Sequence, residues 1–152
     1  MASNRHLGRI VALQTLYEYE FRTQSGDQSA DIDDILTRNF DRYEEAIDDK
    51  DFVKAIVQGV IDQQKDLDEK IQPIAPDWPI DQIARVDRNI LRIGMYELLS
   101  KSGSVPPKVV INEAVELAKA FGSENSSKFI NGVLGTAFRT LVEGESDAVA
   151  TI

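Results

Sequence analysis

The chain has 152 residues, of which 42% are hydrophobic and 28% charged, and its formal net charge is −9. This length allows one domain, or two small packed halves, with a hydrophobic core. The absence of cysteine excludes disulfides, thiolate metal sites and cysteine nucleophiles. No apolar run approaches the roughly 20 residues of a membrane span, and the first residues hold no apolar signal core. We therefore expect a cytoplasmic protein with no membrane association.

The acidic charge is concentrated in one segment. Residues 27–51 hold ten acids and three bases, so they carry −7 of the net −9. The overall charge gives no bulk attraction to nucleic acid, but the rest of the chain is near neutral and can hold a local basic patch. We interpret the acids of residues 27–51 as a solvated face.

Apolar residues at three- and four-residue spacing predict a first helix over residues 4–22. Arg5, His6 and Arg9 lie in its first two turns, where cations oppose the helix dipole. That placement favours a role in binding, and the alternative is a solvated basic surface. His6 is the only histidine, and without cysteine or a second histidine we expect no metal site.

A polar loop and a short helix follow. Asp31 or Asp33 is the expected N-cap of this helix, and its inner face is formed by Ile32, Ile35, Leu36 and Phe40. The acids here superficially resemble a calcium loop. That interpretation fails because Ile32 stands at the required Gly position and Arg38 at the bidentate Glu position.

A further helix is predicted over residues 51–71, and three prolines between residues 73 and 79 then mark the boundary between two halves. Trp78 lies in this linker, and we expect its ring to pack between the halves.

Residues 80–100 predict a long central helix, because apolar side chains fill more than half of its circumference. Arg85, Arg88 and Arg92 share the narrow remaining face. Asp87 falls inside the apolar arc, where a carboxylate needs partners. It either forms an ion pair within the fold or contacts another macromolecule.

The last two helices are predicted over residues 108–121 and 123–141, with Ser123 as the N-cap of the second. Ser126, Lys128 and Phe129 lie in the first two turns of this last helix. A cation, a hydroxyl and an aromatic ring at a helix start suit single-stranded RNA, through phosphate neutralisation and base stacking. The alternative for Phe129 is an ordinary core position.

Several segments together resemble the NusB transcription antitermination family. They are 85–93 (RVDRNILRI), 95–98 (MYEL), 111–119 (INEAVELAK) and 128–134 (KFINGVL), supported by 12–17 (ALQTLY). The resemblance implies an all-α protein of two helical sub-bundles with about six to seven helices. We expect the first half at residues 1–72, the second at 73–145 with its central helix at 80–100, and a flexible tail at 146–152.

The resemblance also implies a function without catalysis or a cofactor. A member of this family is expected to bind boxA-type single-stranded RNA together with the ribosomal protein NusE, and to join the RNA polymerase elongation complex with other Nus factors. Carried onto this sequence, the RNA-binding positions are Arg5, His6, Arg9, Ser126, Lys128 and Phe129. The partner-binding positions are Tyr17, Asp87 and Arg92. The two ends of the chain would then meet in space.

The family's N-terminal motif is usually richer in arginine than the motif found here, where Leu7 and Gly8 interrupt the basic residues. Each missing phosphate contact lowers affinity, so we expect weak RNA binding alone and more reliance on the basic partner.

Two other classes compete with this hypothesis. The first is a protein–protein adaptor with weakened or lost RNA binding. The second is a module of an RNA cytosine methyltransferase, because NusB-like domains also precede such enzymes. This chain has no Gly-rich nucleotide loop and no catalytic cysteine, and neither does it hold a hydrolase motif, so we do not expect it to be an enzyme.

Overall fold

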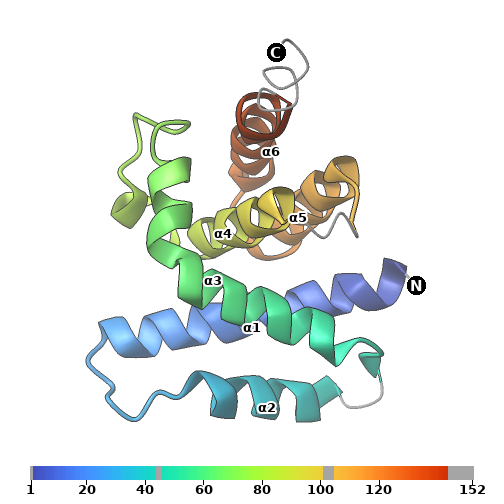
Figure 1. Cartoon of the computed structure of the whole chain (residues 1–152). Helices are drawn as coiled ribbons and strands as arrows, with labels where there is room; N and C mark the ends of the chain where they lie inside the picture. The colour runs from blue at the N-terminus through green and yellow to red at the C-terminus, as the bar shows by residue number, and fades with distance from the viewer. Residues whose placement is uncertain (1, 44–45, 101–104, 144–152) are drawn as a thin grey trace. The chain divides into compact units, whose positions relative to one another are not determined.

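The computed structural model describes residues 2–43, 46–100 and 105–143, with side chains from residue 5 onward. Within these ranges the chain forms six α-helices and no strand, which confirms the all-α prediction (Figure 1). The helices are α1 (Ala2–Gln24), α2 (Ile32–Tyr43), α3 (Lys50–Ile71), α4 (Arg85–Leu99), α5 (Pro107–Phe121) and α6 (Ser126–Ala137). A 3₁₀ turn, η2 (Ile80–Gln82), precedes α4, and a π-helical segment, η3 (Phe138–Glu143), follows α6. The predicted tail at 146–152 lies outside the described residues.

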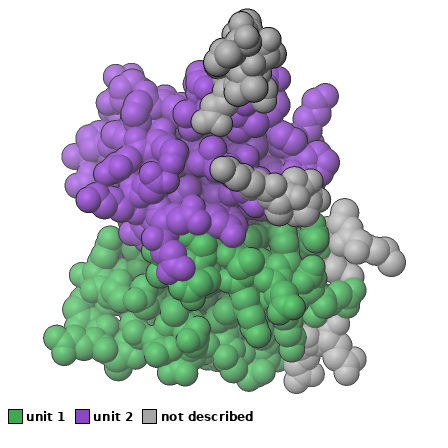
Figure 2. Space-filling model, viewed as in Figure 1, with its two compact units in different colours: residues 1–61 green, residues 62–152 purple. Residues whose placement is uncertain are grey.

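The chain divides into two compact units, residues 1–61 and residues 62–152 (Figure 2). The division falls within α3, eleven residues before the boundary expected from the prolines.

In unit 1, α1 packs against α2. Its buried apolar residues include Val11, Leu13, Leu16, Ile35, Leu36, Phe40, Val53 and Val57. A Cβ on Gly8 would lie 2.9 Å from Val53 Cγ2, so the glycine that interrupts the basic residues allows close approach of α1 to α3. Asp31 caps α2 as predicted, since its Oδ1 accepts the Asp34 N–H at 3.1 Å.

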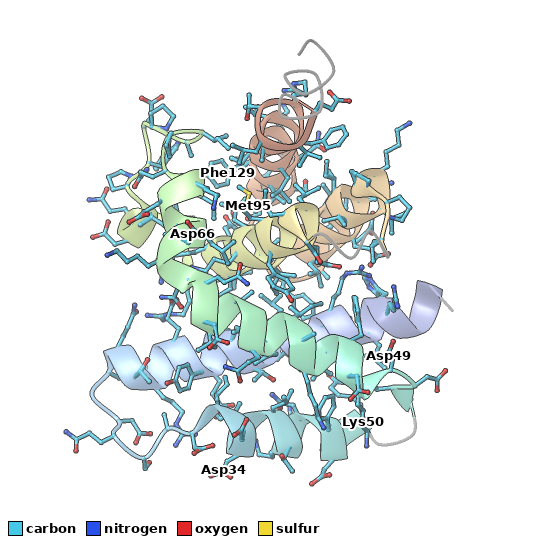
Figure 3. All side chains as sticks on the ribbon, in the orientation of Figure 1. Asp34, Asp49, Lys50, Asp66, Met95 and Phe129 are labelled. Carbon is cyan, nitrogen blue, oxygen red and sulfur yellow. The ribbon has the colours of Figure 1, made fainter. Side chains whose placement is uncertain are left out.

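In unit 2, α4, α5 and α6 all contact one another. Nine of the fifteen residues of α4 are buried, as expected for a central helix. A Cβ on Gly94 would lie 2.6 Å from Leu134 Cδ1, so this glycine lets α4 approach α6 closely. Met95 is fully buried and is labelled in Figure 3.

Two predicted helix boundaries are wrong. The helix expected over residues 80–100 is interrupted at Ile83 and Ala84, whose ψ angles of 134° and 140° are extended. The Arg88 guanidinium donates to the Ile83 carbonyl at 2.8 Å, so a side chain replaces the missing helical hydrogen bond. The last helix begins at Ser126 rather than Ser123, and its α-helical part ends at Ala137.

Two arginines of the narrow face predicted within residues 80–100 are buried. Arg88 and Arg92 are 5% and 4% exposed. Arg88 is held by backbone carbonyls. Arg92 donates from Nε and Nη2 to the two carboxylate oxygens of Asp68, both at 2.8 Å. Such bidentate pairing satisfies a buried arginine inside the fold.

Candidate nucleic-acid interface

Ser126, the first residue of α6, is buried and its hydroxyl is fully engaged. Its Oγ donates to Asp87 Oδ2 at 3.0 Å and accepts the Ser123 N–H at 2.8 Å. The Ser123 hydroxyl lies 3.1 Å from the same oxygen. Because the single Ser126 proton points to Asp87, Ser123 supplies the proton of that third bond. Ser126 therefore has no hydrogen-bonding capacity left for RNA, and its contact with RNA is not favoured by this geometry.

Gly122 makes this hydrogen-bond network sterically feasible. Its φ of −89° is open to any residue, so backbone conformation does not require glycine there. A Cβ at this position would lie 2.6 Å from both Ser126 Cβ and Ser126 Oγ, and 2.8 Å from the Ala118 carbonyl. Gly122, the C-cap residue of α5, is thus needed for the space that it leaves beside Ser126.

Lys128 and Phe129 lie on the outer side of the α6 start. Lys128 is exposed and Phe129 is half-buried. Both line a pocket of about 280 Å³, here called the Trp78 pocket, with the loop before η2 (Figure 3 labels Phe129). The pocket is lined by Ile74, Ala75, Pro76, Asp77, Trp78, Lys128, Phe129, Gly132 and Val133. Trp78 is 56% exposed, so the expectation that it is packed away is wrong.

At the start of α1, the predicted RNA-binding cations stack on one aromatic ring. The guanidinium carbons of Arg5 and Arg9 lie 4.5 and 5.0 Å from the centroid of Phe52. Arg5 also forms an ion pair with Asp49 at 3.6 Å, and Asp49 caps α3 by accepting the Phe52 N–H at 3.0 Å (Figure 3 labels Asp49). Arg9 is only 2% exposed, whereas Arg5 and His6 are partly exposed. Arg9 thus has a packing role, and Arg5 and His6 are the members of this group whose side chains are accessible to a ligand.

The predicted partner-binding residues also differ from one another. Tyr17 is 37% exposed on α1. Asp87 is partly exposed and bound to Ser126, and its Oδ1 is buried with no hydrogen-bond partner among the described residues. Arg92 is paired with Asp68 inside the fold. Partner contact by Tyr17, Asp87 and Arg92 stays a prediction.

The structure brings together some of the predicted residues and leaves others apart. Ser126 and Asp87, assigned from sequence to two different surfaces, are hydrogen-bonded to each other. Arg5 and Arg9 share the ring of Phe52. Because α1 and α6 belong to different units, the expected meeting of the two chain ends stays a prediction.

Several residues of these sites were missed from sequence. Asp49 had a signal, since an aspartate just before a helix is a common N-cap. Phe52 belonged to an apolar stripe and looked like ordinary core. Asp77 had no signal, because its place in the Trp78 pocket depends on a loop conformation that periodicity does not describe.

The described residues hold no group of three or more His, Cys, Asp or Glu side chains arranged for a metal ion. None of the helices, over the residues that can be described, is both long and apolar enough to cross a membrane.

Comparison with known proteins gives a consistent result. The NusB family model matches residues 6–139. The transcription antitermination protein NusB of Chloroflexus aggregans is 42% identical over 149 residues, covering 97% of this chain and 95% of that protein. A crystal form of T. maritima NusB is 32% identical with a TM-score of 0.75, covering 87% of this chain and 88% of that chain.

A chain in a crystal structure of the antitermination factors NusB and NusE in complex with double-stranded RNA is 24% identical, with a TM-score of 0.75. The match covers 92% of this chain and 99% of that chain. At this identity, the likeness supports the fold alone.

Proposed function

This chain belongs to the NusB family, and on that premise we propose that it is an RNA-binding transcription antitermination factor. In this proposal it binds boxA-type single-stranded RNA together with the ribosomal protein NusE. The pair then joins the RNA polymerase elongation complex with other Nus factors, in the cytoplasm. The activity is binding, and no step of it requires catalysis.

One observation supports RNA binding most directly. Lys128 is exposed at the start of α6 and, among the described residues, takes part in no salt bridge, while Phe129 and the exposed Trp78 line the same pocket. Single-stranded nucleic acid is bound by this combination of a cation for the phosphate and aromatic faces for the bases. Arg5 and His6 at the start of α1 are the second group of proposed contacts.

A protein–protein adaptor is the second candidate function. It is favoured by Arg9 and Ser126, which are two of the six residues assigned to RNA. Both are buried, and the Ser126 hydroxyl is bonded to Asp87 within the chain. In the adaptor, Tyr17 and Asp87 would still bind NusE, and RNA would add nothing to the complex.

The decisive experiment measures binding of a boxA-type RNA at several salt concentrations, with and without NusE. Lys128→Ala should weaken binding and reduce the slope of log affinity against log salt by about 0.7, the increment for one phosphate contact on a single strand. The matched control is Lys119→Ala, which removes another exposed lysine, paired on α5 with Glu116. This control should leave both affinity and slope unchanged.

If RNA binding is undetectable even with NusE present, the adaptor is the correct function. If Lys119→Ala and Lys128→Ala weaken binding equally, the interaction is a general charge effect and the α6 start is not the site.

A further inference from the structure

We propose that the Trp78 pocket holds one unstacked base of a single-stranded RNA, with Lys128 at the adjoining phosphate and Asp77 at the edge of the base. This inference rests on the proposed RNA-binding function and adds a nucleotide subsite on the loop before η2.

The loop that carries Trp78 is fixed before any ligand arrives. The Gln72 amide donates to the carbonyl of Trp78 at 2.9 Å and to that of Ala75 at 3.2 Å. Its Oε1 accepts the Ile80 N–H at 2.8 Å. A single side chain thus binds three points of the loop, and the Trp78 N–H donates to the Ala75 carbonyl at 3.1 Å. A prearranged loop avoids the entropy cost of ordering on binding.

The exposure of Trp78 fits an aromatic platform. Tryptophan side chains are highly buried on average, yet Trp78 is 56% exposed. Ala75, in the same loop, is only 6% exposed. Stacking between a base and an aromatic ring is strong and tolerates any base, because every base has a π-face.

The size of the pocket favours a base over a protein segment. Its volume of about 280 Å³ is just below the range of about 300–1,000 Å³ typical of pockets for drug-sized ligands. An amphipathic helix of a partner would need a longer groove with anchors over two turns. One planar ring system suits a pocket of this size whose lining includes the buried apolar residues Ala75 and Val133.

The two charged residues of the pocket have opposite uses. Lys128 and Asp77 are both exposed, and neither forms a salt bridge in the part of the chain that is described. A lysine can bind phosphate, whereas a carboxylate can only accept hydrogen bonds. Asp77 should therefore favour a base that donates from an amino group, as cytosine, adenine and guanine do, over uracil, which has none.

Intrinsic fluorescence tests the inference directly, because Trp78 is the only tryptophan in the chain. Titration of the full chain with single-stranded boxA-type RNA should quench this fluorescence with the same midpoint as binding measured on labelled RNA. A paired duplex of the same sequence should not quench it, since its bases are already stacked. Trp78→Ala should weaken binding roughly 5- to 150-fold, the range for loss of one stacked base.

Trp78→Phe provides the matched variant, because it keeps a stacking face while changing the same position. It should restore most of the affinity lost in Trp78→Ala, with an unchanged helical circular dichroism signal in both. For the base edge, an oligocytidylate should bind more tightly than an oligouridylate of equal length. Asp77→Asn, whose amide both donates and accepts, should reduce this preference.

The outcomes separate this inference from the proposed function. RNA binding with unchanged Trp78 fluorescence, or an unaltered affinity in Trp78→Ala, overturns the pocket and leaves the RNA-binding function standing. Fluorescence that responds to NusE and not to RNA also overturns it, since the occupant is then a protein. Absence of RNA binding under every condition overturns both.

Discussion

The starts of α1 and α6 were both predicted to bind RNA, but their cations are in different states. Arg5 and Arg9 lie against Phe52, and Arg5 is paired with Asp49 in the same unit. Lys128 projects beside the Trp78 pocket and, among the described residues, has no carboxylate partner.

The difference shows what an RNA phosphate would meet at each place. At α1 the phosphate competes with the Asp49 carboxylate, which is already paired with Arg5, so RNA binding replaces one ion pair with another. At α6 the Lys128 cation meets no carboxylate in the part of the chain that is described, and the internal hydrogen bonds are made by neighbouring residues such as Ser126. We therefore expect α6 to contribute more binding energy than α1, although α1 carries more positive charge.

The largest effect should come from disturbing the internal network under α6. Gly122→Ala places a Cβ against Ser126 and the Ala118 carbonyl, so the start of α6 must shift. We expect the free energy of unfolding to fall by about 1–3 kcal/mol, as for overpacking, with weaker RNA binding. Chemical denaturation measures the change.

Gly132→Ala is the matched control for that variant. Gly132 lies within α6, and a Cβ there would meet nothing within 4 Å. The same substitution should thus raise the free energy of unfolding by about 0.5–1 kcal/mol, because alanine favours the helix. Equal effects at the two positions would show that Gly122 is not needed for space.

A smaller effect should distinguish the α1 side. Asp49→Asn keeps an N-cap acceptor for Phe52 but removes the charge that holds Arg5. We expect RNA affinity to rise by roughly 1.5- to 5-fold, equivalent to the 0.2–1 kcal/mol of an exposed ion pair. The measurement is RNA affinity at fixed salt.

Asp66→Asn changes the net charge by the same amount, in a pair with Lys70 on α3, and should leave RNA affinity unchanged. If both variants raise affinity equally, relief of general repulsion explains the gain. The paired state of Arg5 would then be irrelevant to binding.

The smallest effect concerns the far end of α1, where unit 1 again pairs its arginines internally. Hydrogen bonds from the Ser29 hydroxyl, and then from Arg22, lower the pKa of Asp27 from 3.8 to about 2. The folded state therefore binds this proton more weakly than the unfolded state does. The resulting stability is present above pH 3.8 and is lost as the pH falls towards about 2.

Asp27→Asn should accordingly have a lower thermal midpoint than the natural chain near neutral pH. The difference should shrink across the window from pH 3.8 to about 2. A difference that stays constant with pH would mean that the Asp27 carboxylate charge is not the source of the stability.

The regular parts of the fold were predictable because they depend on local periodicity. Helices α1, α3 and α5 begin and end within two residues of the ranges inferred from apolar spacing. The predicted start of the helix over residues 80–100 was wrong, because the Ile83 carbonyl accepts a hydrogen bond from the side chain of Arg88, five residues along the chain, and not from a helical backbone N–H. A long side chain that satisfies the backbone in this way leaves no trace in an apolar pattern.

The sequence predicted which polar residues lie near the proposed binding sites, but not which of them already have hydrogen-bond partners within the fold. The sequence pattern placed Ser126 and Arg92 on polar positions, but it could not show that Asp87 and Asp68 lie within hydrogen-bonding distance of them. Those partners are 39 and 24 residues away in sequence. For Trp78 the predicted exposure was too low. Its apolar character suggested burial, whereas the loop bound by Gln72 keeps the ring at the surface.

The contact between Gly122 and Ser126 also constrains how this protein can evolve. A side chain at position 122 would occupy the space of the residue that begins α6, so position 126 cannot remain serine in its present place if glycine is lost. A change at position 126 does not by itself relieve this contact, because the Ala118 carbonyl would lie 2.8 Å from the same Cβ, so loss of glycine at position 122 passes through a less stable protein. Related proteins that keep the hydrogen bond between positions 126 and 87 should therefore have glycine at position 122 and a hydroxyl side chain at position 126.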